Sequence, residues 1–135
     1  MTKITLFGRP ITKKNSQRIV LAKNGRRFLI QSKQYLTYEN DCLWQIKEQL
    51  TILSLQRRIP KPVLFPIMGS VSLQALYYMP TKRIPDLINL LQATADILEK
   101  AKVIENDRNI ISLDGSKIMG VDKVSPRTEI TIEGR

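Results

Sequence analysis

The stretch from Met79 to Ile110 constrains the fold most, because it combines a clear amphipathic helix with sharp boundaries. A proline follows Ile84 and favours extended backbone there, so the helix begins at or just after Asp86. At about 100° per residue, its apolar side chains fall in one arc of roughly 120°, and its Asp and Asn side chains lie on another face. The predicted core face consists of Leu87, Leu90, Leu91, Thr94, Ile97, Leu98 and Ala101.

Asp86, at the start of this helix, has two interpretations. Aspartate is among the best N-cap residues, so Asp86 can serve only to accept a hydrogen bond from the amide of Ile88 or Asn89. The alternative is that the cap position aims its carboxylate out of the fold, beside Lys82 and Arg83.

A second acidic segment, Glu105-Asn106-Asp107, follows the helix. A strand beginning near Asn109 would bring Asp107 back beside Asp86. Carboxylates that converge next to basic residues suit a hard cation and a phosphate group.

Charge is the strongest compositional signal. The chain has 22 Lys and Arg against 12 Asp and Glu, a net charge of +10. Such an excess predicts a polyanionic partner, with phosphate contacts dominating affinity. The alternative is a solvated basic surface without a partner, but the basic residues are clustered along the chain.

Several classes of protein are excluded or disfavoured. The chain has no histidine, which excludes histidine-based zinc sites, histidine general bases and Ser-His-Asp triads. The single cysteine, Cys42, fits a reducing cytoplasm and is expected to be a small buried apolar residue. No apolar run approaches the length of a membrane-spanning helix.

The N-terminal part predicts a basic, DNA-facing edge. Residues 3–7 alternate as a strand, and residues 12–18 form either a phosphate-binding loop or an ordinary polar loop. Asn24-Gly25 predicts a hairpin with Lys23, Arg26 and Arg27 at its tip. Ser32 is expected to cap a long core helix running from Lys33 to about Ile52, with Trp44 near the edge of its apolar stripe.

Three motifs resemble the RusA family of Holliday junction resolvases. They are P-D-L-x-N-L-x-x-A-x-x-D-x-L with the acidic turn after it, the N-terminal P-I-T-K-K-N-S, and Q-S-K-x-Y-x-x-Y-E. The resemblance implies a small homodimeric nuclease that uses Mg2+, with Mn2+ as a substitute. It also implies paired nicks in four-way DNA junctions, as part of recombination and repair.

The resemblance makes Asp86 and Asp107 the catalytic, metal-binding residues. Two positions depart from the family pattern. Ile88 stands where a second carboxylate of the D-L-D-N motif is expected, and Gln92 stands where a lysine is expected. Isoleucine cannot bind a metal, so Asn89 or Glu105 is the candidate third ligand. Asp96 lies about 15 Å along the helix from Asp86, too far to share an ion, and is expected to be structural.

We therefore predict one α/β (α+β) domain over residues 1–135, with a mixed, largely antiparallel sheet and two main helices. The predicted function is a Mg2+-dependent endonuclease that resolves four-way junctions; it is cytoplasmic and does not bind membranes. One alternative is a catalytically impaired protein that still binds branched DNA, and a weaker one is an RNA-binding protein. The predicted DNA contacts are Lys13, Lys14, Asn15, Arg18, Arg26, Arg27, Lys82, Arg83 and Gln92.

Overall fold

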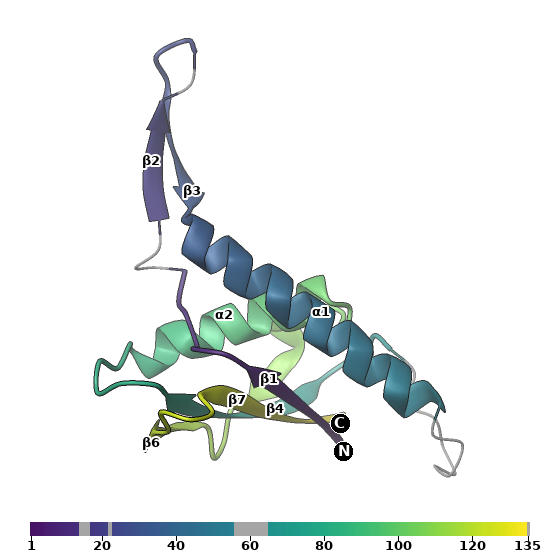
Figure 1. Ribbon diagram of the computed structural model, residues 1–135. Helices are drawn as coiled ribbons and strands as arrows, with labels where there is room; N and C mark the ends of the chain where they lie inside the picture. Colours follow the sequence, from purple (N-terminus) through teal and green to yellow (C-terminus); the bar gives the residue numbers. More distant parts are fainter. Residues whose placement is uncertain (14–16, 22, 56–64, 135) are drawn as a thin grey trace.

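The structure is a computed structural model that describes residues 1–13, 17–21, 23–55 and 65–134. It contains the predicted strand near residues 3–7, the hairpin at Asn24-Gly25, the two main helices and the strand that follows Asn109 (Figure 1). The strands are β1 (Thr2–Phe7), β2 (Gln17–Leu21), β3 (Arg27–Gln31), β4 (Val71–Met79), β5 (Ile110–Ser112), β6 (Lys117–Val121) and β7 (Arg127–Gly134). The helices are α1 (Lys33–Leu55), α2 (Leu87–Lys100) and the short 3-10 helix η1 (Asp107–Asn109).

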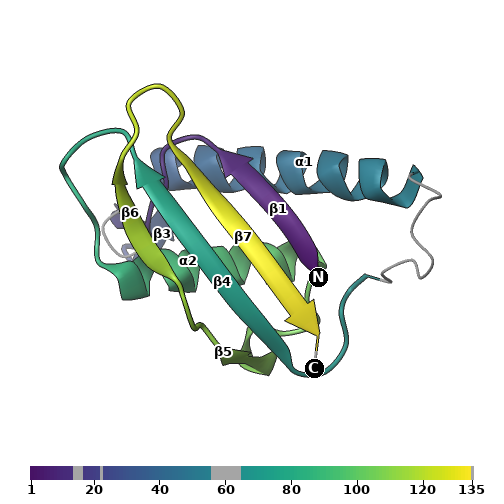
Figure 2. The same cartoon turned by 90° about the horizontal axis from the view of Figure 1, so that it is seen from below.

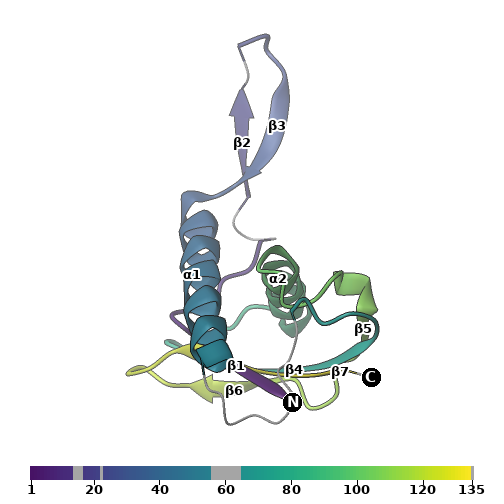
Figure 3. The same ribbon diagram turned by 90° about the vertical axis from the view of Figure 1, so that its right-hand side faces the viewer.

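The central strand of the main sheet is β4. It pairs antiparallel with β7, which in turn pairs antiparallel with β1, and it pairs in parallel with both β5 and β6. Alternate residues of β4 are buried along its whole length, because α1 and α2 both cover one face of the sheet (Figures 2 and 3). The predicted mixed α+β architecture is confirmed.

The core lies between this sheet and the two helices. It includes Ile4 and Leu6 of β1, Leu73 of β4, and Ile97 and Leu98 of α2. Cys42 of α1 is fully buried in the same core, and desolvation raises the pKa of its thiol to about 12. The thiol is therefore protonated and shielded, as expected for a small apolar core residue.

Helix α1 begins as predicted but orients Trp44 differently. The Ser32 hydroxyl accepts a hydrogen bond from the Tyr35 amide at 3.1 Å, so Ser32 is the predicted cap. Trp44 is 70% exposed, so the prediction that it lies near the edge of the apolar stripe is wrong. It follows the buried Tyr35 by nine residues, which is about half a turn out of phase at 3.6 residues per turn.

The outer edge of the sheet is occupied by side chains of α1. The Gln49 side chain accepts a hydrogen bond from the Thr5 amide at 3.0 Å and donates one to the Thr5 carbonyl at 2.6 Å. Gln45 makes the same pair of bonds with Phe7, at 2.7 and 2.9 Å. Two side-chain amides thus replace the missing neighbouring strand of β1.

This arrangement works because two periodicities match. Four residues of α-helix rise about 6 Å, and two residues of β-strand rise about 6.8 Å. Glutamines four apart on α1 therefore meet strand residues two apart on β1. An unpaired edge can recruit another chain, so the glutamines also protect the sheet from edge-to-edge association.

The β2–β3 hairpin projects away from the sheet and the two helices (Figures 1 and 3). Its turn is the predicted one: Asn24 accepts a hydrogen bond from the Arg26 amide at 3.1 Å, and Gly25 has a φ of 83°. Within the described chain, no helix is both long enough and apolar enough to cross a membrane.

We expect Gln49→Ala to lower the free energy of unfolding by about 1–2 kcal/mol, because two backbone groups of Thr5 lose their partners. Urea denaturation measures the change, and Glu48→Ala, one residue away on the exposed surface, is the control. Equal midpoints for Gln49→Ala and the native protein would contradict the proposed protection of the edge.

Candidate active site on helix α2

Asp86 occupies the N-cap position of α2 but does not cap it with its side chain. Its backbone is extended, with φ −65° and ψ 133°, and its carbonyl accepts the first helical bond from Leu90 at 3.1 Å. Among the residues that the structure describes, its carboxylate accepts only a long hydrogen bond, 3.4 Å, from the Asn89 side chain. Of the two interpretations, the structure therefore favours an exposed carboxylate that is available to another partner.

The acidic turn is held against the last turn of α2. The Asp107 amide donates to the Glu99 carboxylate at 3.1 Å, and Asn106 accepts a bond from the Arg108 amide at 3.0 Å. These bonds fix the backbone of Asp107. Its own carboxylate is half-buried and forms no hydrogen bond or salt bridge with another described residue. Glu99 is a positioning residue that sequence reasoning missed, because no periodicity links it to Asp107.

Asp107 faces a pocket of about 380 Å³ on the outer side of α2. The helix side chains that line it include Ile88 and Gln92, the two positions that depart from the resembled pattern. Ile88 is 79% exposed. The complete lining is Ile88, Leu91, Gln92, Ala95, Asp107, Arg108, Ile110 and Leu113.

The structure thus unites Asp107 with Ile88 and Gln92. Asp86 stands two residues before Ile88 and is not among the residues that line the pocket. Glu105 is exposed and accepts a 3.4 Å bond from Asn109. Among the described residues, no three Asp, Glu, Cys or His side chains gather closely enough to form a metal-binding cluster.

Asp96 has the structural role expected for it. Its carboxylate forms a 2.9 Å salt bridge with Lys13 and accepts a 3.4 Å hydrogen bond from Gln92. Lys13 also lies 5.8 Å from the centre of the Tyr35 ring. The charge of Lys13 is therefore partly neutralised by Asp96 within the protein. DNA binding by this lysine remains a prediction.

The other predicted DNA contacts are distributed over two regions. Lys82 and Arg83 are exposed in the turn before α2, and Arg26 and Arg27 are exposed at the hairpin tip. Lys14 and Asn15 lie outside the described residues, as does the side chain of Arg18.

The motif at the start of α1 is structural. Tyr35 is fully buried and Glu39 is only 6% exposed, and the Glu39 carboxylate forms a 2.7 Å salt bridge with Lys100 at the end of α2. Burial, reinforced by the nearby Glu39, raises the pKa of Tyr35 well above its usual value. The salt bridge between Glu39 and Lys100 thus joins the two helices.

Comparison with known proteins identifies the class. A family model of endodeoxyribonucleases matches residues 8–133, nearly the whole chain. The protein is therefore a hydrolase that acts on phosphodiester bonds of DNA. The family is RusA, and the chain belongs to it as a Holliday junction resolvase that acts on branched DNA. A search of curated proteins found no match.

We expect Glu99→Ala to speed hydrogen exchange at the Asp107 amide by at least about tenfold, because that amide loses a charge-assisted bond. Glu99→Gln keeps an oxygen acceptor and should show a smaller change. Nuclear magnetic resonance exchange of backbone amides measures both. An unchanged exchange rate in Glu99→Ala would show that Glu99 does not hold the acidic turn.

Proposed function

We propose that this protein cuts four-way DNA junctions in a Mg2+-dependent reaction, with Asp86 and Asp107 as the metal ligands and catalytic residues. Mn2+ is expected to substitute for Mg2+. The observation that carries the proposal is the pocket beside α2, which Asp107 lines together with Ile88 and Gln92, the two helix positions where the resemblance implies a carboxylate and a lysine. The reaction is expected to take place in the cytoplasm, in recombination and repair.

The donor set is compatible with magnesium bound largely through water. Mg2+ usually keeps several waters and needs only one or two protein carboxylates. The Asn89 side chain donates an N–H to Asp86, so the Asn89 side-chain oxygen is a candidate third ligand. Glu105 is the other candidate. A bound Mg2+ would lower the pKa of a water and offset charge on the scissile phosphate.

The residues of this chain then have separate tasks. Asp86 and Asp107 supply negative charge from opposite ends of the sequence motif, and Glu99 keeps the Asp107 turn in place. Lys82 and Arg83 in the turn before α2, with Arg26 and Arg27 at the hairpin tip, provide positive charge for backbone phosphates. A homodimer would present two such sites to opposed strands of a junction.

A second candidate function is binding of branched DNA with impaired cutting. The observation in its favour is Ile88, whose apolar side chain lines the pocket and is 79% exposed. The resemblance implies a carboxylate at this position. A weakened metal site would leave the basic binding surface intact. The two candidates predict the same binding and different cleavage.

Cleavage of a labelled four-way junction, with and without Mg2+, separates these candidates. We expect the native protein to nick the junction, and we expect Asp86→Asn and Asp107→Asn to bind it in Ca2+ while cutting at least about 100-fold more slowly, because each loses a charged ligand. Asp114→Asn, an exposed aspartate in the turn after β5, is the control. Native-like cutting by both site variants would contradict these assignments.

Ile88→Asp tests the missing carboxylate directly. The added ligand should tighten the metal site, so the concentration of Mg2+ that gives half-maximal cleavage should fall. Ile88→Asn has a similar size without the charge and is the matched control. If the native protein binds junctions but cuts only after Ile88→Asp, the second candidate function is correct.

A further inference from the structure

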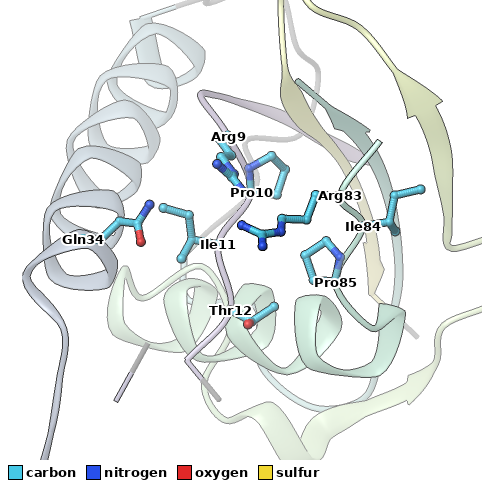
Figure 4. A pocket seen from close by; sticks show the side chains of 8 residues that line it. All are labelled: Arg9, Pro10, Ile11, Thr12, Gln34, Arg83, Ile84 and Pro85. Atoms are coloured by element: carbon cyan, nitrogen blue, oxygen red, sulfur yellow. The ribbon is translucent and has the colours of Figure 1, made fainter. Parts of the chain in front are cut away.

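A second pocket lies beside the turn that precedes Asp86, between three segments that are distant in the sequence (Figure 4). It has a volume of about 330 Å³. Its lining comes from the chain after β1, the first turn of α1 and the turn before α2. The residues are Arg9, Pro10, Ile11, Thr12, Gln34, Arg83, Ile84 and Pro85.

Two guanidinium groups supply the charge of this pocket. Arg9 and Arg83 are both exposed, and neither forms a salt bridge with any residue that the structure describes. Figure 4 shows the Arg83 side chain extending toward Ile11, with Pro85 beside it and Gln34 reaching in from α1. None of the described residues that line the pocket is acidic.

This chemistry is suited to a phosphodiester. Arginine presents planar N–H donors that match phosphate oxygens, and the Gln34 amide adds a neutral donor. The lining is completed by Pro10, Ile11, Thr12, Ile84 and Pro85.

The pocket lies next to Asp86, one of the proposed catalytic residues. Pro85 lines it and is followed directly by Asp86. On the side toward α1, a neighbouring hollow of about 500 Å³ shares Arg9, Ile11 and Gln34 and adds Lys33 and Asp41. The phosphate contact is therefore expected at the two arginines of the pocket beside Asp86, and not in this neighbouring hollow, where Lys33 is accompanied by Asp41.

We propose that Arg9, Gln34 and Arg83 bind a backbone phosphate of the DNA strand that is cut, close to the scissile phosphate. This contact positions the strand over Asp86 and takes no part in the chemical step. The inference rests on the proposed function, because it assigns a strand-positioning contact to the same nuclease. Arg9 and Gln34 are new assignments, and Arg83 gains a specific task.

Binding of a four-way junction in Ca2+, measured by fluorescence anisotropy at several salt concentrations, tests the contact. We expect Arg9→Gln and Arg83→Gln each to weaken binding about tenfold, since each removes charged hydrogen bonds to phosphate. The slope of log affinity against log salt should fall by about 0.9 for one lost phosphate contact. Lys47→Gln removes one charge from the exposed surface of α1 and should change affinity less than about twofold.

Neutral methylphosphonate linkages placed one at a time around the cleaved bond locate the contact. One linkage near that bond should weaken binding of the native protein but have no further effect on the Arg9→Gln/Arg83→Gln double variant. Native-like binding by both single variants, or an equal methylphosphonate effect in the native protein and the double variant, would overturn the pocket assignment alone. A native protein that shows no affinity for junctions would overturn the proposed function as well.

Discussion

The packing of α2 against the central strand β4 determines the position of the whole candidate site. A buried hydrogen bond of 2.7 Å joins the Tyr77 hydroxyl of β4 to the Thr94 hydroxyl of α2, within a small cluster that includes Ala75 and Leu90. The chain must pass from the end of β4 to the start of α2 through a short basic turn. The fixed helix therefore places that turn, Asp86 and the pocket of Ile88 and Gln92 in one region.

Four acidic residues on or near α2 and the acidic turn form two contrasting pairs. Asp96 and Glu39 are paired with Lys13 and Lys100, and these pairs join the N-terminal segment and α1 to α2. Asp86 and Asp107 form no salt bridge with any described residue. The first pair thus joins elements of the fold, and the second pair remains without a salt bridge where the proposed function places a cation and DNA.

Local patterns in the sequence predicted what depends on local physics. The helix at Leu87–Lys100 follows from its apolar period, and the Ser32 cap and the Asn24-Gly25 turn follow from residue preferences. Contacts between distant segments could not be predicted from these patterns. Gln45 and Gln49 look like ordinary exposed helix residues until β1 lies beside them, and the Arg9 pocket needs three separate segments to meet. From the sequence, Arg83 was predicted as a DNA contact and Arg9 was not.

Ile88 changes how a nuclease site of this kind would have to work. With one carboxylate fewer beside Asp107, protein ligands alone would hold Mg2+ less tightly, and more of its coordination would fall to water and to the DNA phosphate. Metal binding and strand binding would then be coupled, since the phosphate can serve as a ligand only when the strand is correctly placed. In the proposed mechanism, precise placement by Arg9 and Arg83 therefore compensates for the ligand that Ile88 cannot provide.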